Sequence, residues 1–111
     1  MDSLDVYRQI IETVLNDYAS VPYAYGDIQA EVVVDRVNDR YLIMTLGWDD
    51  KRRIHGCIVH IDIIGEKLWI QRDGTEHGIA LDLVEAGIPK ESIVLAFRPL
   101  ELRQYTEYAV T

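Results

Sequence analysis

The sequence predicts an α+β domain in which an antiparallel β-meander sheet packs against an N-terminal helix and a second helix. Near the N-terminus, apolar residues recur at three- and four-residue spacing, which is typical of an amphipathic helix. Residues 41–72 hold three apolar runs, and the short polar breaks at residues 49–52 and 65–66 suit hairpins. A second helical pattern and a short apolar run follow, so a sheet of about five strands is expected, with the second helix before the last strand.

The chain has 111 residues, of which 49% are hydrophobic, and this size predicts a single domain over residues 1–111. The single cysteine, Cys57, excludes an internal disulfide and fits a reducing compartment. The N-terminus lacks the basic start and apolar run of a signal peptide, and no apolar run approaches the ~20 residues of a membrane span. We therefore expect a soluble, cytoplasmic protein.

The first helix is predicted over residues 3–18. Asp2 or Ser3 can cap its start, and Pro22 requires it to end earlier, because the residue before a proline is disfavoured in the α region. Residues 19–27 are then a loop.

Four strands are predicted over residues 28–37, 40–48, 53–64 and 67–72. The second has apolar residues on both faces, which predicts a central strand that is covered on both sides. Alternation along the third places Cys57 on one face with Val59, and His60 with Asp62 on the other.

A second helix is predicted to begin at residues 73–76, where Asp73 or Thr75 can cap it, with Gly78 inside it and Gly87 just past its end. The fifth strand is expected at residues 92–97. A crossover through the second helix that makes this strand parallel to its neighbour is possible, but the sequence leaves the strand order open. The aromatic tail, residues 103–110, is expected to be ordered.

Three residue pairs have chemistry that a site could use. His55 and Cys57 share a strand face, as two ligands of one metal would, but no second pair completes a zinc set. His60 and Asp62 resemble a base with its orienting carboxylate, without an evident nucleophile. Asp49 and Asp50 suit magnesium, and equally a turn. We favour the structural interpretation for each pair and expect no metal, no cofactor and no enzymatic activity; the weaker alternative is a metal-dependent enzyme with its site at His60 and Asp62 or at Asp49 and Asp50.

A partner surface is predicted instead from exposed aromatic residues, since tyrosine and tryptophan are enriched at interfaces. The candidates are Tyr23, Tyr25, Trp48, Tyr105 and Tyr108. The alternative is direct DNA binding by the basic cluster of Lys51, Arg52 and Arg53. The net charge of −8 disfavours it and favours DNA contact only through a partner. A homodimer is also possible.

Four segments of the chain are distinctive. The first is YRQIIETVLNDYASVPYAYGDIQ, and the most specific are GWDDKRRIHGC, WIQRDGTE and the closing RQYTEYAV. These segments resemble the XisI family of small cyanobacterial proteins, and the resemblance covers residues 7–110. It implies an accessory role in excision of a DNA element, the fdxN element, during heterocyst development, together with a separate recombinase.

The resemblance further implies an XisH-like protein as the partner, because XisI proteins are typically encoded beside XisH, which resembles a nuclease fold. The family supplies no catalytic residues to assign here. The sequence thus predicts a regulatory factor that acts by protein–protein interaction.

Overall fold

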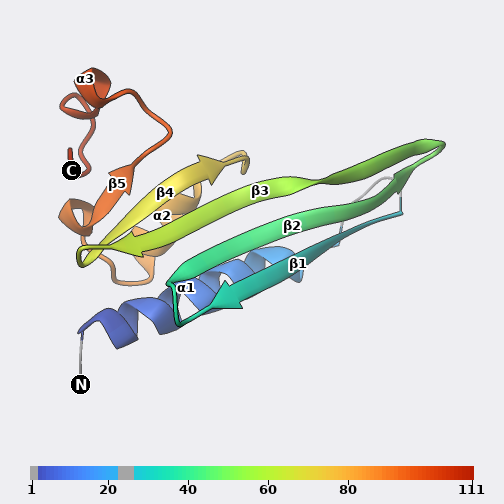
Figure 1. The fold of residues 1–111 in the computed structure, drawn as a ribbon, viewed down its shortest axis with the longest axis horizontal. Helices are drawn as coiled ribbons and strands as arrows, with labels where there is room; N and C mark the ends of the chain where they lie inside the picture. Colours follow the sequence, from blue (N-terminus) through green and yellow to red (C-terminus); the bar gives the residue numbers. More distant parts are fainter. Residues whose placement is uncertain (1–2, 23–26) are drawn as a thin grey trace.

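The computed structural model describes residues 3–22 and 27–111. Figure 1 shows one sheet with α1 and α2 on the same side of it and the C-terminal segment beyond β5. The elements in chain order are α1 (Ser3–Ala19), β1 (Asp27–Asp35), β2 (Arg40–Asp49), β3 (Arg52–Ile64), β4 (Lys67–Asp73), α2 (Ile79–Glu85), the 3₁₀ helix η1 (Lys90–Ser92), β5 (Ile93–Leu95) and α3 (Leu100–Arg103).

The sheet has the order β1-β2-β3-β4-β5, with every strand beside its sequence neighbour. The first three pairings are antiparallel, whereas β5 lies parallel to β4. Since a parallel neighbour needs a crossover connection, α2 supplies it. The predicted α+β class and meander are confirmed, and the question of the crossover is answered.

Each hairpin turns at a residue with positive φ. Gly65 (φ 56°) and Glu66 (φ 71°) have the signs of a type I′ turn, which matches the twist of the strands it joins. Asp50 (φ 57°) and Asp39 (φ 55°) stand at the other two turns. Aspartate tolerates this conformation better than most residues do, which explains why the polar breaks predicted the turns correctly.

The core lies between the sheet and the two longer helices. Ile11 and Leu15 of α1 and Leu83 of α2 are completely buried, as are Tyr41 and Ile43 of β2. This confirms the predicted stripe of the first helix, because the apolar spacing brings those side chains onto one face.

The prediction that the second strand is covered on both sides is wrong. Tyr41, Ile43 and Thr45 are buried under the helices, whereas Leu42 and Met44 on the other face are only half-buried. We call that other face of β1, β2 and β3 the outer face. Both helices pack on one side of the sheet, so the apolar outer face is a surface rather than a second core.

Because of a β-bulge, the Cys57 side chain lies on the opposite face of β3 from the one predicted. Ile43 pairs with Val59 but Met44 pairs with Cys57, which leaves Ile58 as the extra residue. An extra residue shifts the alternation of the strand by one position. Cys57 therefore lies on the outer face with Met44, not in the core with Val59.

The second helix starts later than predicted. The Asp73 carboxylate accepts hydrogen bonds from the backbone N–H of Thr75 (2.9 Å) and of Ile79 (2.8 Å), and so holds the intervening segment as a loop. Gly78 precedes α2 at φ 92° instead of lying within it. The end is as predicted: Gly87 (φ 119°) follows the helix.

The C-terminal tail is ordered, as predicted. The Ala109 N–H donates to the Ile93 carbonyl (2.8 Å), and Tyr108 packs against the core. The Arg103 guanidinium lies 5.6 Å from the centre of the Trp69 ring. None of the helices within residues 3–22 and 27–111 is long and apolar enough to cross a membrane.

Candidate protein-binding surface

The free end of the β2–β3 hairpin projects beyond the rest of the sheet (Figure 1). β3 starts at Arg52, but its pairing with β4 begins only at Val59. On the other side of β2, β1 continues to pair as far as Asp27 with Trp48. We call this three-stranded extension, residues 27–31, 44–49 and 52–57, the arm.

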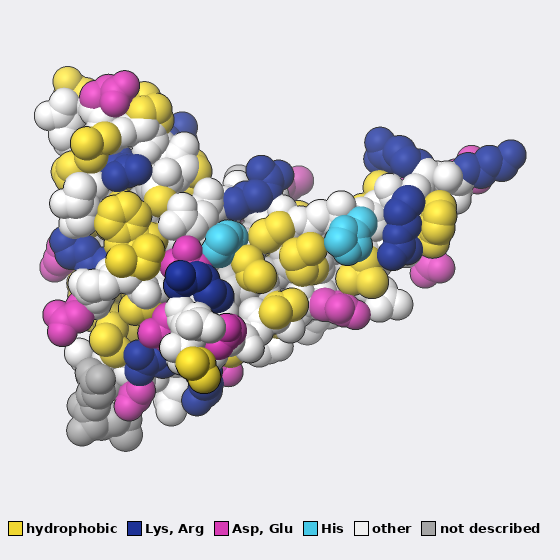
Figure 2. All heavy atoms as spheres, viewed as in Figure 1, with side chains coloured by type: hydrophobic (Ala, Val, Ile, Leu, Met, Phe, Trp, Pro, Cys, Tyr) yellow, Lys and Arg dark blue, Asp and Glu magenta, His cyan; other side chains and the backbone are white. Residues whose placement is uncertain are grey.

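Apolar side chains gather on the outer face from the body of the sheet into the arm. Leu42, Met44 and Leu46 are half-buried, and the exposed fractions of Val33 and Trp48 are 43% and 48%. Figure 2 shows hydrophobic side chains over β2 and β3, with histidines among them and Lys and Arg side chains at the tip of the hairpin. An apolar patch with a charged border is typical of a surface that binds another protein.

The basic cluster lies at the tip, as its place in the sequence predicts. Lys51, Arg52 and Arg53 are all exposed. The Arg53 guanidinium stacks 5.3 Å from the centre of the Trp48 ring, and Arg52 lies 3.7 Å from the Asp49 carboxylate. The tip therefore combines an aromatic residue with positive charge that acidic neighbours partly offset.

His60 and Asp62 are brought together as the sequence suggested. A hydrogen bond of 2.8 Å joins His60 Nε2 to Asp62 Oδ1. Arg40 Nε lies 3.4 Å from the same oxygen, and Gln71 donates to the other at 3.4 Å. The nearly buried Asp62 carboxylate thus holds together side chains from β2, β3 and β4 on the outer face.

His55 and Cys57 share the outer face, but the Cys57 thiol donates to the Val59 carbonyl (3.1 Å). Burial raises the pKa of this thiol, which disfavours the thiolate that binds metals. Among the described residues, no three His, Cys, Asp or Glu side chains lie close enough to hold a metal ion, and this includes Asp49 and Asp50.

The aromatic candidates do not form one surface. Trp48 is on the arm, whereas Tyr105 and Tyr108 follow α3 at the opposite end of the molecule (Figure 1). Tyr105 is 80% exposed, while Tyr108 packs against the core. Tyr23 and Tyr25 lie outside the described residues.

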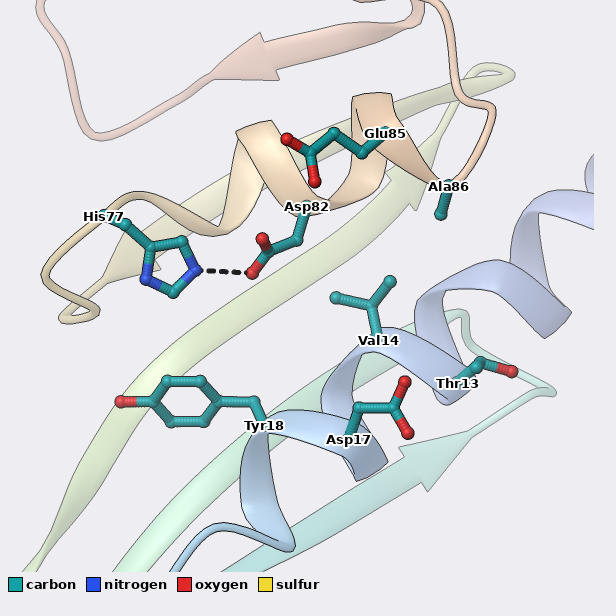
Figure 3. A pocket seen from close by; sticks show the side chains of 8 residues that line it. All are labelled: Thr13, Val14, Asp17, Tyr18, His77, Asp82, Glu85 and Ala86. Atoms are coloured by element: carbon teal, nitrogen blue, oxygen red, sulfur yellow. Dashed lines mark hydrogen bonds and ion pairs between the residues drawn. The ribbon is translucent and has the colours of Figure 1, made fainter.

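Sequence reasoning missed a pocket of about 490 Å³ between α1 and α2, which Figure 3 shows. Asp17 and Tyr18 of α1 face His77, Asp82 and Glu85 from the α2 region. His77 Nε2 lies 2.6 Å from Asp82 Oδ2, and this hydrogen bond raises the pKa of His77. The residues are far apart in sequence, so no spacing indicated the pocket.

Replacement of Asp82 by asparagine is expected to return the pKa of His77 towards its ordinary value, since the carboxylate is the main cause of the rise. In the native protein the His77–Asp82 interaction contributes stability fully below the ordinary histidine pKa and loses it as pH rises through the raised value. An NMR titration of the His77 ring protons measures the shift. Glu85→Gln is the control, because Glu85 is the weakest contributor; an equal shift in both variants would contradict the assignment.

The molecule is thus a small α+β domain with helices on one face of the sheet, an open outer face and a projecting hairpin. A family model described as XisI protein matches residues 1–110. The chain therefore belongs to the XisI family, as the sequence segments indicated.

Two crystal structures from Anabaena variabilis ATCC 29413 have the same fold. One, a XisI-like protein, is 34% identical with a TM-score of 0.88, and the match covers 97% of this chain and 99% of that one. The other, the fdxN element excision controlling factor XisI, is 32% identical with a TM-score of 0.83, over 99% and 100% of the two chains. Curated protein sequences give no match.

Proposed function

We propose that this protein is a non-catalytic accessory factor that controls excision of a DNA element by binding a protein partner of the XisH type. The observation that carries the proposal is the open outer face, where Leu42, Met44 and Leu46 lead to the exposed Trp48. Membership of the XisI family supports the excision role, since a relative of full-length similarity is named as an excision controlling factor.

The charge distribution supports a protein partner over DNA as the direct contact. The chain carries a net charge of −8, and DNA affinity comes mainly from Lys and Arg contacts with phosphates. A protein that meets DNA through a basic partner avoids this repulsion. The acidic chain then acts on DNA only through the complex.

Co-expression with an XisH-type protein tests the proposal. Size-exclusion chromatography with light scattering is expected to give one peak with the combined mass of both proteins. Two separate peaks at both low and physiological salt would overturn the partner model.

Within that complex, Leu46→Lys is expected to weaken binding at least about tenfold, because it places a charge in the apolar outer face. The matched control is Leu81→Lys on α2, where the leucine is 50% exposed on the helical side of the molecule. Titration calorimetry gives both dissociation constants, and equal melting temperatures establish that the variants fold. Equal affinities would show that the partner binds elsewhere.

Direct DNA binding by Lys51, Arg52 and Arg53 is the second candidate, and the exposed Arg53–Trp48 stack at the tip favours it. It requires affinity for single-stranded or duplex DNA that falls steeply with salt. If the isolated protein did not bind DNA, or bound it with an affinity independent of salt, this second candidate function would be rejected.

A further inference from the structure

Among the described residues, the arm has two strand edges without a strand partner, the outer edge of β1 and the first half of β3, and only the second is lined by a groove. β3 extends over Arg52–Ile64, but β4 pairs only from Val59 to Ile64. Within the described part of the chain, residues 52–57 pair with β2 on one side and with no strand on the other, whereas the carbonyl of the bulge residue Ile58 accepts from the Gly74 N–H. We call residues 52–57 the open edge. Unpaired edges are where a further strand can add to a sheet.

The backbone of the open edge presents hydrogen-bonding groups to this free side. The Cys57 carbonyl accepts from Arg72 Nε (2.7 Å), which comes from β4, so this carbonyl points away from β2. Backbone directions alternate along a strand. The N–H and C=O groups of Arg53 and His55 consequently point to the same free side, where an added strand would bond to them.

A groove of about 380 Å³ follows the open edge, and three arginines line it. Among the described residues, Arg53 and Arg72 form no ion pair with a carboxylate, and the nearest one to Arg52 is 3.7 Å away. Arg8, Arg36 and Lys90, by contrast, each lie 2.6 Å from a carboxylate oxygen. The groove thus holds positive charge that the rest of this acidic chain does not neutralise.

From these two observations we propose that the open edge binds an acidic, extended segment of a protein partner by strand addition. The backbone of the segment pairs with Arg53 and His55, and its carboxylates lie beside Arg52, Arg53 and Arg72. The inference rests on the proposed function, because it assigns this segment to the protein partner.

The charges of the groove favour an acidic β-strand over a second copy of this chain and over duplex DNA. A second copy of the open edge would bring its own three arginines into the same groove, where like charges repel. Duplex DNA would meet the carboxylates of Asp49 and Asp50 at the tip and would leave the backbone groups of the edge without partners. An acidic β-strand neutralises the arginines of the groove and also forms hydrogen bonds with the free backbone groups of the open edge.

Two variants test the edge in the complex with the XisH-type protein. His55→Pro removes one free-side N–H, which proline lacks, without removing a bond to β2. Arg53→Glu reverses one groove charge, and the matched control is Arg98→Glu, an equal charge change at an exposed residue after β5. Each edge variant is expected to weaken binding at least about tenfold and the control less than about twofold. Native affinity in Arg53→Glu and in a folded His55→Pro would overturn strand addition while leaving the partner proposal intact.

A test with the isolated protein separates the two proposals. The probe is an acetylated peptide of alternating glutamate and valine, matched in length to residues 52–57 and followed by ¹⁵N NMR and amide hydrogen exchange. Shifts confined to the open edge and Arg72, with slowed exchange at His55, are expected, and an alternating lysine–valine peptide should give none. The edge site then stands even if no XisH-type complex forms. No shift at millimolar peptide, or the same shifts with short duplex DNA, would overturn it.

Discussion

Gly47→Ala is expected to lower the free energy of unfolding by about 3 kcal/mol or more. Gly47 has φ 150°, and a Cβ atom there would lie 1.9 Å from the Asp27 carbonyl oxygen and 2.7 Å from Ile28 Cα. Both atoms belong to the β1 backbone, so β1 has to move away from β2. Adding an atom to a packed site costs ~1–3 kcal/mol, and a residue with a side chain at an unfavourable φ costs a similar amount.

Gly56→Ala is the matched control on the neighbouring strand. Gly56 of β3 pairs with Thr45 of β2, and a Cβ atom at Gly56 would meet nothing within 4 Å. This variant is expected to change the free energy of unfolding by less than about 0.5 kcal/mol. Urea unfolding at neutral pH compares the two, and hydrogen exchange should show faster exchange in β1 of Gly47→Ala only. Equal stability of both variants would show that β1 does not need the close approach at Gly47.

The second large effect is a loss of stability at high pH that originates in Tyr41. This side chain is fully buried, and its hydroxyl donates to Asp39 Oδ1 (3.1 Å). The pKa of Tyr41 is raised to about 12, mainly by burial and to a smaller extent by the hydrogen bond to Asp39. A raised pKa means that the fold favours the protonated phenol, so this contribution is complete below about pH 10 and is lost as pH rises through about 12. Since one pKa unit corresponds to ~1.4 kcal/mol, the loss is about 3 kcal/mol.

Tyr41→Phe provides the control, because phenylalanine fills the site without an ionisable group. The difference in unfolding free energy between native protein and variant is expected to shrink by about 2 kcal/mol between pH 10 and 12. Absorbance of tyrosinate gives a second measure, as one late-titrating tyrosine should vanish in the variant. A difference that stays constant over this pH range would place the origin of any alkaline unfolding in other groups.

Asp39 explains how this buried phenol is positioned. Its carboxylate accepts from Arg8 Nε at 2.8 Å and from Arg8 Nη2 at 3.1 Å, and these bonds lower the pKa of Asp39. Arg8 thereby ties α1 to the turn between β1 and β2. In Asp39→Asn the pKa of Tyr41 should fall only part of the way, because burial remains.

Much of the fold was predictable because local chemistry specifies it. The stripe that includes Ile11 and Leu15 predicted α1, and the polar breaks at residues 49–52 and 65–66 predicted two hairpins. Gly87 predicted the end of α2 through its positive φ. These signals involve residues within a few positions of one another, so no distant part of the chain has to be known.

The incorrect predictions involve interactions that a local pattern does not reveal. Gly78 and Thr75 were expected to lie in or cap a helix, but Asp73 bonds to the Ile79 N–H and delays its start. The bulge at Ile58 changes which face Cys57 occupies, although alternation along the strand suggested otherwise. The apolar outer face of β2 looked like core, because a strand pattern does not show whether helices pack on one side or on both.

Some features of the candidate site were likewise predictable from the sequence, and others were not. The sequence by itself determined the XisI family, the hairpin and the adjacent basic cluster of Lys51, Arg52 and Arg53, because neighbours in a short turn remain neighbours in space. Only the tertiary structure decided that β4 stops short of the arm, that Arg72 joins Arg52 and Arg53 beside the open edge, and that α1 and α2 enclose a pocket. Strand length and register settle these features, and both depend on how the whole sheet packs against its helices.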